Sequence, residues 1–517
     1  MERSEKVFLL LIVLYAFFLR IHRLFIPDVI ANDGVFYVGC AKLIEKGDFT
    51  QFKETCFFNL YPILIYFFHK FLDDWEISGR LVSIVFGTLS VIPLYLLTKT
   101  LINIRIGLVL VLFYATLPSV VEFSSDVLRE GLFWFLFFSS LYFGIVALLR
   151  KRWLFLFLSS FFLVLSLFTR IEGVIVLPLI LLYAVYARLK KKTTRKDTLI
   201  GFPLSYCAIF SLVFIFTLVL FKFLTSDWEL GPLGHKMETV QFSRKLVELK
   251  LEEELRSLTS LSSFSHSLVD LALRYRYVLY ASEIVYKTLK SLGVLSLAFL
   301  VLGILKDDNP LPVGKFFYLF WIIISVLVSY VYVVFYHYFS TRHGLLIGIP
   351  LLLWCSKGFY GISSFLENRM VFWKKISQSG RVTPIVLLTL VVTYSLVANL
   401  GPSRPDKLEY KQAGICLKEY GLKEKKVVTR PNLARVLFYA EAQPVYLEFV
   451  EDPVFIQQHM LREKISFLLI DSKAKTMFEK KRSLHDAGFR EISVPCLDSL
   501  KKYSFFLFTI PVDPGDR

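Results

Sequence analysis

The sequence contains few cysteines, and their spacing does not suggest a metal site. Six cysteines are scattered over 517 residues, without a CxxC pair or a Cys/His metal pattern. Cys40 and Cys56 fall in one predicted loop, and Cys416 and Cys496 fall in one predicted domain. Either pair can oxidise outside the cytosol, but we expect all four to be unpaired, buried thiols.

Other signatures of common function classes are absent too. The chain has no Gly-rich phosphate loop, no low-complexity tract, no internal repeat and no trace of the inverted repeats that mark many transporters. The segment Met1–Arg23 combines a charged start with an apolar stretch but lacks a small-residue cleavage site. We therefore expect a retained signal-anchor helix with a cytoplasmic N-terminus.

Apolar residues, by contrast, are abundant. They make up 55% of the chain, and 51 residues are Phe, more than a soluble protein of this length can bury or display. They lie in runs of about 17–25 residues, the length that crosses ~30 Å of hydrocarbon. We predict a polytopic α-helical membrane protein with about 11 transmembrane helices. The predicted spans are 7–26, 79–100, 106–123, 131–149, 153–169, 173–189, 199–221, 288–305, 315–337, 344–366 and 382–400.

The net charge of +17 is concentrated in clusters next to these spans, at 150–152, 190–196 and 374–375. This distribution is typical of the positive-inside rule and of contact with anionic membrane lipids, and it argues against nucleic-acid binding. All three clusters are cytoplasmic if the N-terminus is inside. The protein is then an integral protein of a bacterial inner or archaeal plasma membrane.

This topology places loops 27–78 and 222–287, and the chain after residue 401, outside the cytoplasm. The stretches 35–44, 60–72 and 242–255 have amphipathic spacing. The last of these is either a solvated connector or a helix that gates substrate. We thus divide the chain into a transmembrane domain, 1–401, and a soluble domain, 402–517.

Residues 402–517 alternate helical patterns with short β-rich runs, which predicts a small α/β extracytoplasmic domain with a mostly parallel sheet. Without a phosphate loop, we expect no nucleotide there. The predicted helices are 405–420, 431–440, 451–463 and 472–487, and the predicted strands are 426–429, 444–448, 465–471, 491–494 and 503–510.

Ionisable residues gather at the outer ends of the spans, where they are expensive to keep near lipid and are therefore functional candidates. Each one alone has a plain structural explanation: an arginine can anchor a helix end to headgroups, and Glu172 can serve as the local partner of Arg170. Acids and arginines from five parts of the chain nevertheless share one face. They are Asp33, Arg80, Glu122, Asp126, Arg129, Glu130, Arg170, Glu172, Arg342 and His343.

This mixture suits the transfer of a sugar from a polyprenyl phosphate. Because the departing phosphate needs little protonation, the enzyme needs a carboxylate to accept the proton of the acceptor hydroxyl. It also needs fixed cations to hold the phosphate as negative charge develops. Asp33 and Glu130 fit the first role, and Arg80, Arg170 and Arg342 fit the second.

The order of motifs resembles the GT-C superfamily of lipid-dependent glycosyltransferases. The resemblance is carried by Leu19-Arg20, Asn32-Asp-Gly-Val-Phe-Tyr37, Lys46-Gly-Asp48, Leu60-Tyr-Pro62 and Gly79-Arg80. It is greatest to the branch of protein O-mannosyltransferases and bacterial aminoarabinose and lipopolysaccharide-core transferases. Leu128-Arg-Glu130, with Asp126 as competitor, matches the second-loop acid of that family, and Thr169–Gly173 and Ser340–Gly344 resemble two later loops.

The resemblance implies an inverting glycosyltransferase with Asp33 as the catalytic base and Glu130 as a second catalytic acid residue. Tyr61, Asp126, Arg129, Glu172 and His343 would join the arginines in binding substrate. The family's first-loop motif has a second acid where this chain has Gly34. Some relatives bind a divalent metal at these acids, but a lone Asp is a poor site for a hard cation. We expect that no cofactor is required.

Two other function classes stay open: a transporter or flippase for a lipid-linked sugar, and a non-catalytic scaffold. A saccharide polymerase or ligase that uses lipid diphosphate donors is a further enzyme alternative, because the loop 222–287 holds four arginines, Arg244, Arg256, Arg274 and Arg276. The sugar, hexose or pentose, and the acceptor, a glycolipid, a saccharide or a protein hydroxyl, are not encoded in any pattern of the sequence.

Overall fold

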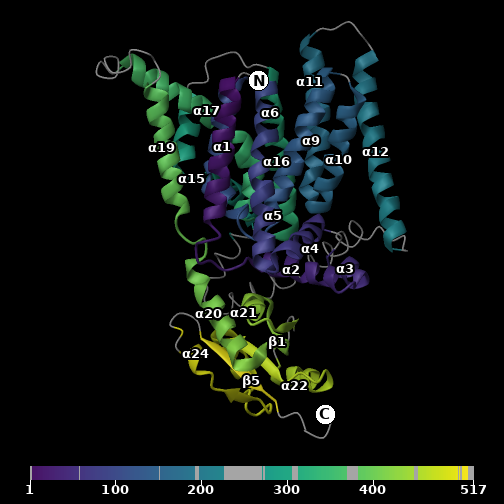
Figure 1. The fold of residues 1–517 in the computed structure, drawn as a ribbon, viewed down its shortest axis with the longest axis vertical. Coiled ribbons are helices and arrows are strands. Elements are labelled where there is room, and N and C mark those ends of the chain that lie inside the picture. Colours follow the sequence, from purple (N-terminus) through teal and green to yellow (C-terminus); the bar gives the residue numbers. More distant parts are fainter. Residues whose placement is uncertain are drawn as a thin grey trace. The chain divides into compact units, whose positions relative to one another are not determined.

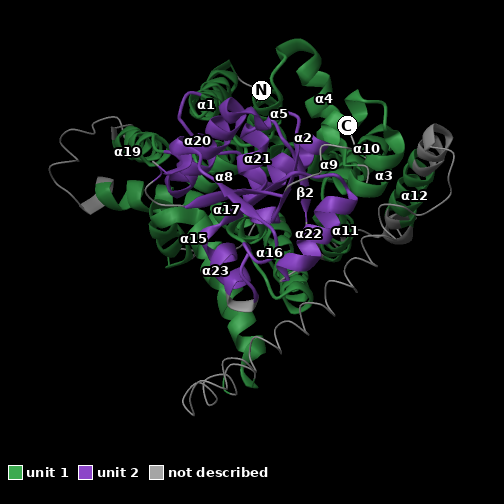
Figure 2. Cartoon of the chain, turned by 90° about the horizontal axis from the view of Figure 1, so that it is seen from below, with its two compact units in different colours: residues 1–24, 40–401 green, residues 25–39, 402–517 purple. Residues whose placement is uncertain are grey.

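The structure, a computed structural model, describes residues 3–56, 59–150, 152–191, 197–225, 271, 274–305, 313–369, 382–446, 452–498, 500 and 504–510. The chain forms two compact units (Figure 2). Unit 1 contains residues 1–24 and 40–401, and unit 2 contains residues 25–39 and 402–517. The predicted amphipathic helix 242–255 lies outside the described residues.

Unit 1 is a bundle of helices (Figure 1). In the part of the chain that the structure describes, five helices are long and apolar enough to cross a membrane: Trp75–Leu101, Glu130–Arg150, Arg276–Leu305, Gly314–Tyr336 and Thr341–Leu366. The prediction of a polytopic helical membrane protein is confirmed, and the count of about 11 spans stays a prediction. The helices are α1 (Arg3–His22), α3 (Phe49–Cys56), α4 (Leu60–Leu72), α5 (Trp75–Leu89), α6 (Val91–Leu101), α7 (Ile104–Thr116), α8 (Pro118–Phe123), α9 (Glu130–Arg150), α10 (Trp153–Thr169), η1 (Ile171–Ile175), α11 (Val176–Lys191), α12 (Asp197–Thr225), α15 (Arg276–Leu305), α16 (Val313–Tyr336), α17 (Thr341–Arg369) and α19 (Val382–Asn399).

Side-chain caps mark the start of several of these helices. Asn59, Asp74 and Asn103 each accept a hydrogen bond from a backbone N–H in the first turn of α4, α5 and α7. Pro118 occupies the first turn of α8, where its missing N–H costs nothing. The caps explain why an almost uniformly apolar sequence breaks into helices at these positions.

The interior of unit 1 is largely aromatic, and its outer surface is apolar. Trp134, Phe137, Phe138 and Trp321 pack together in the core, where α9 meets α16. Large apolar side chains such as Val294, 76% exposed, cover the outside. A surface of this kind is expected where lipid replaces water.

Unit 2 contains a five-stranded sheet with helices. The strand order is β2-β1-β3-β5-β4, with β1 parallel to β2 and β3, and β5 antiparallel to β3 and β4. The five strand regions match the prediction, but the sheet is mixed, so the expected mostly parallel order is wrong for its second half. The elements are α20 (Leu408–Leu417), β1 (Lys426–Thr429), α21 (Ala434–Tyr439), β2 (Gln443–Tyr446), α22 (Pro453–Arg462), β3 (Phe467–Asp471), α23 (Ser472–Lys481), β4 (Arg490–Ile492), α24 (Pro495–Asp498) and β5 (Phe505–Thr509), with the short helices η2 (Pro405–Lys407), η3 (Lys418–Leu422) and η4 (Pro431–Leu433).

The expectation of unpaired cysteines is wrong. Cys40 and Cys56 form a disulfide in unit 1, and Cys416 and Cys496 form one in unit 2. Among the described residues, Cys207 and Cys355 are the free thiols. Residue spacing alone could not reveal either pair, because each bridge depends on how separate elements pack.

Candidate active site

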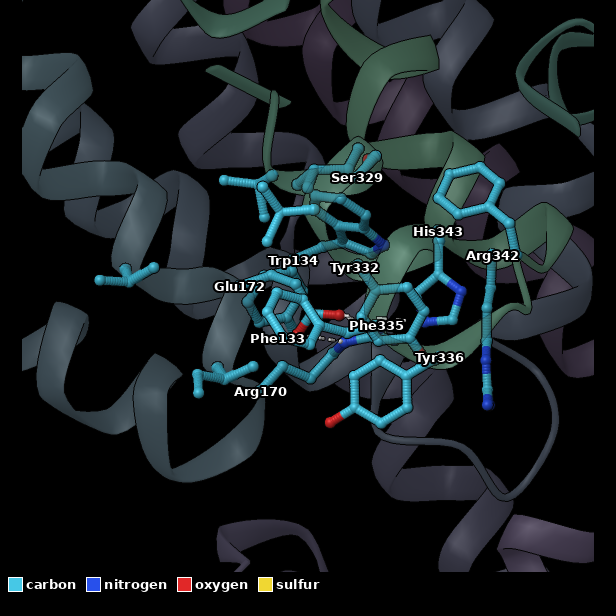
Figure 3. Close-up of a pocket in the computed structure, with 16 residues that line it drawn as sticks. Phe133, Trp134, Arg170, Glu172, Ser329, Tyr332, Phe335, Tyr336, Arg342 and His343 are labelled. Atoms are coloured by element: carbon cyan, nitrogen blue, oxygen red, sulfur yellow. Dashed lines mark hydrogen bonds and ion pairs between the residues drawn. The ribbon is translucent and has the colours of Figure 1, made fainter. Parts of the chain in front are cut away.

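A cavity of about 340 Å³ opens among η1, α9, α16 and α17 in unit 1. Its walls are mostly apolar and aromatic, with side chains such as Phe133, Trp134, Tyr332 and Phe335. Two arginines, a glutamate and a histidine also line it: Arg170, Glu172, Arg342 and His343 (Figure 3). An apolar cavity with a few convergent polar groups is the usual form of a small-molecule site.

Arg170 is the centre of the polar side of this cavity. It is only 5% exposed, and its guanidinium contacts two carboxylates. Nη1 donates to Glu130 Oε1 at 2.5 Å, while Nη2 donates to Glu172 Oε1 at 2.5 Å and Nε to Glu172 Oε2 at 3.2 Å. The bidentate pair with Glu172 fixes the plane of the guanidinium.

Arg342 and His343 bring the start of α17 to the same cluster. Arg342 Nη1 lies 3.7 Å from Glu130 Oε1, and His343 Nε2 lies 4.0 Å from Glu172 Oε1. The His343 ring is held by Ser340 Oγ, 2.8 Å from Nδ1, and packs against Tyr332. Five predicted site residues, Glu130 among them, are thus brought together from the start of α9, from Arg170 and η1, and from the start of α17.

A further arginine lies next to this cluster. Arg129 donates a hydrogen bond from Nη1 to the Thr169 carbonyl, at 2.9 Å. Glu130 is 1% exposed, and its Oε2 has no hydrogen-bond partner within the described part of the chain. Arginines grouped in this way suit the binding of a phosphate, which can accept paired N–H bonds from a guanidinium.

Three predicted substrate-binding residues lie in other surroundings. Tyr61 is fully buried, and its hydroxyl bonds Gly79 O at 2.8 Å and Ser83 Oγ at 2.7 Å, which ties α4 to α5. Arg80 pairs with Glu76 at 2.7 Å, one turn earlier on α5. Asp126 accepts from the backbone N–H of Val127 at 2.7 Å. None of the three is among the residues that line the cavity.

Sequence reasoning missed the aromatic wall of the cavity. Tyr332, Phe335 and Tyr336 lie near the end of α16, and the rings of Tyr332 and Tyr336 stack at 4.5 Å. In the sequence they are part of an ordinary apolar span. The sequence does contain one hint, the tyrosines grouped near the end of this span, because the hydroxyl of a Tyr in lipid usually needs a polar partner.

Asp33 belongs to unit 2. It lies partly buried in the first turn of α2 (Asn32–Glu45), and the division between the units falls inside this helix, between Gly39 and Cys40. Among the described residues, no group of three or more His, Cys, Asp or Glu side chains is arranged to hold a metal ion.

The arrangement of the helices defines a polytopic membrane protein with the GT-C glycosyltransferase fold. The chain is similar to the archaeal oligosaccharyltransferase of Archaeoglobus fulgidus tethered with an acceptor peptide (TM-score 0.59, 12% identity, 95% of this chain and 73% of that one). The same enzyme in a complex with Zn and sulfate gives a TM-score of 0.56 at 13% identity, over 94% and 72% of the two chains.

ArnT from Cupriavidus metallidurans bound to undecaprenyl phosphate matches with a TM-score of 0.56 at 9% identity, over 97% of both chains. Residues 60–220 match the family described as dolichyl-phosphate-mannose-protein mannosyltransferase. No curated protein matches the chain. The predicted resemblance to the GT-C superfamily, in its mannosyltransferase and aminoarabinose transferase-like branch, is confirmed by these matches.

Proposed function

We propose that this protein transfers a sugar from a polyprenyl-phosphate donor to an acceptor on the extracytoplasmic face of the membrane. The observation that carries the proposal is the cluster of Arg170, Arg342, Glu130 and Glu172 beside an aromatic cavity of about 340 Å³. The fold and the family match support glycosyl transfer, and the cavity suggests where a lipid-linked phosphate binds.

The cluster fits the charge of the proposed donor. A sugar joined to a polyprenyl monophosphate is a phosphodiester with a single negative charge, and the guanidinium groups of arginines suit the binding of such a phosphate. The apolar wall of Val328, Val331 and Phe335 suits the isoprenoid chain.

Asp33 is the base in this proposal. The acceptor hydroxyl oxygen attacks the anomeric carbon, its proton passes to the Asp33 carboxylate, and the bond from carbon to the phosphate oxygen breaks. The electron pair of that bond stays on the phosphate, whose charge the arginines stabilise. Attack opposite the leaving group inverts the anomeric centre.

The disulfides support the proposed sidedness. Cys40–Cys56 and Cys416–Cys496 both need an oxidising compartment. The positive-inside distribution of basic residues is independent support for an external location of their segments. ArnT with undecaprenyl phosphate and the oligosaccharyltransferase with its acceptor peptide are consistent with a polyprenyl carrier and a range of acceptors.

The test is a comparison of Asp33→Asn with Asp406→Asn, an exposed carboxylate of unit 2. Mass spectrometry of glycolipids and glycoproteins from cells with and without the gene identifies the missing sugar and acceptor. We expect Asp33→Asn to lower transfer to that acceptor by at least about a hundredfold, with normal expression, and Asp406→Asn to retain it. Full transfer by Asp33→Asn would show that Asp33 is not the base. Movement of the labelled lipid across liposomes without transfer would favour a flippase.

A further inference from the structure

The segment that leads into the Asp33 helix is built into the soluble domain. Residues 28–31 of unit 2 are all buried, and Val29 belongs to a hydrophobic core formed with side chains of α20 and α21 such as Leu417, Val436 and Leu437. A loop that only connected two helices would normally lie on the surface. Val29 is instead part of a core of the domain formed by 402–517.

Polar contacts fix the backbone of the same segment. The Asp28 carboxylate accepts from the N–H of Val29 through Oδ1 and from the N–H of Ser403 through Oδ2, both at 2.9 Å. Arg404 Nη1 donates to the Val29 carbonyl at 3.0 Å. Hydrogen bonds within a buried segment are costly to break, because a lone buried donor or acceptor loses its partner without gaining water.

Tyr439 holds Ile30, the residue that follows Val29. The N–H of Ile30 donates to Tyr439 Oη at 3.0 Å, and Ile30 is fully buried. Tyr439 is the last residue of α21 and packs closely against α20: a Cβ added at Gly414 would lie only 2.5 Å from the Tyr439 Cβ. The tyrosine is therefore positioned by the domain before it contacts the segment.

The helix that carries Asp33 starts directly on these fixed residues. The N–H of Val35 donates to the Ala31 carbonyl at 3.1 Å, so the first turn of α2 is anchored on a buried residue. Asp33 lies within this turn. Any displacement of residues 28–31 is thus passed to Asp33 through a single turn of helix.

We propose that the soluble domain positions the catalytic carboxylate, with Tyr439, Asp28 and Arg404 as positioning residues for Asp33. This inference rests on the proposed role of Asp33 as base. In this proposal, residues 402–517 have a direct role within unit 2. They set the orientation of the first turn of α2. Small displacements of a catalytic group lower the rate of the chemical step far more than they lower substrate binding.

The experiment compares Tyr439→Phe with Thr429→Val in the full-length protein in lipid nanodiscs. Tyr439→Phe removes the acceptor for the Ile30 N–H. Thr429→Val removes one buried hydrogen bond of the same domain, from Thr429 Oγ1 to the Leu469 carbonyl at 2.9 Å, which does not involve the segment. Hydrogen exchange of the peptide covering 28–33 is measured for each variant, together with kcat and the donor KM.

We expect Tyr439→Phe to raise exchange of 28–33 about tenfold. We expect its kcat to fall about tenfold or more, with little change in the donor KM. Thr429→Val should leave the exchange of 28–33 and kcat unchanged even where it lowers thermal stability. Arg404→Met, which removes the donor to the Val29 carbonyl, provides the same readouts if Tyr439→Phe folds poorly.

Unchanged exchange in both Tyr439→Phe and Arg404→Met would show that these residues do not hold the segment. Faster exchange with an unchanged kcat would show that holding it does not position Asp33. A failure of the proposed function has a different signature: Asp33→Asn then retains transfer, while the exchange of 28–33 still reports the anchoring.

Discussion

Arg170 illustrates how a single buried cation can be both structural and functional. All three of its guanidinium nitrogens donate to carboxylates, two of them to Glu172 and one to Glu130. A lysine would keep the charge but can reproduce at most part of this fork, because its ammonium is a compact point charge on a flexible stem. The geometry of the arginine, rather than its charge alone, holds η1 against α9.

We therefore expect Arg170→Lys to lower sugar transfer about ten- to hundredfold and to weaken binding of polyprenyl phosphate. The matched control is Arg150→Lys at the far end of α9, where the arginine is exposed and contacts the Phe155 ring at 5.9 Å. Transfer assays and lipid-binding measurements on both variants decide the question. If Arg170→Lys and Arg150→Lys behave alike, the fork plays no part in donor binding.

For single residues, the sequence could predict which side chains are costly to place in lipid, but not which of them come together in one site. Arg170, Glu172, Arg342 and His343 line one cavity, whereas Arg80 is occupied by Glu76 on its own helix. The difference lies in helix packing, which ionisable residue types do not encode. The Tyr61 hydroxyl bonds Gly79 O and Ser83 Oγ of α5, and its expected role in binding substrate stays a prediction.

The contact between α15 and α17 depends on two glycines that leave no room for a side chain. A Cβ at Gly358 would overlap the Phe299 carbonyl, and a Cβ at Gly303 would overlap the Trp354 carbonyl. Without a hydrophobic driving force between helices in lipid, such close backbone approach is a main source of their association. Since α17 begins at Thr341 and carries Arg342 and His343, this contact also sets one side of the cavity.

We expect Gly358→Ala to lower the melting temperature in detergent, because overpacking of this kind costs about 1–3 kcal/mol. The same substitution at Gly201 in α12 has nothing within 4 Å of the added Cβ. There it should be neutral or stabilising by up to ~1 kcal/mol, since Ala favours the helix over Gly. Thermal unfolding followed by size-exclusion fluorescence measures both. Opposite signs support the close contact, and an equally stable Gly358→Ala would contradict it.

Elements were predictable where one physical signal dominates. The predicted span 131–149 agrees closely with α9, Glu130–Arg150, because a long apolar run leaves few alternatives. Strand regions were predictable for similar reasons, but strand direction was not. β4 and β5 are consecutive in the chain and pair antiparallel, and the alternation of helices and strands that suggested a parallel order does not specify which strands become neighbours.

At the scale of the whole molecule, the two disulfides bear on orientation in the membrane. Cys40–Cys56 and Cys416–Cys496 each join parts of one unit. These pairs could not be preferred from residue spacing, because bridges between cysteines 16 and 80 residues apart depend on the folded chain. We expect both regions to mature in an oxidising compartment, where such bridges persist, and the ends of the spans that carry the basic clusters to stay in the cytoplasm.

The disulfides and the basic clusters together predict which side of the membrane each region occupies. A membrane-impermeant maleimide added to spheroplasts after mild reduction should label Cys496, which is exposed in the C-terminal domain. A cysteine introduced by Arg152→Cys, in the exposed turn between α9 and α10, should react only after the membrane is permeabilised. The reverse pattern would put the Cys416–Cys496 bridge in a reducing compartment, where it would not persist, and the proposed extracytoplasmic site would then be wrong. The pattern we expect requires Asp33 and the domain that anchors it to meet their acceptor outside the cytoplasm, so the acceptor must be an exported molecule.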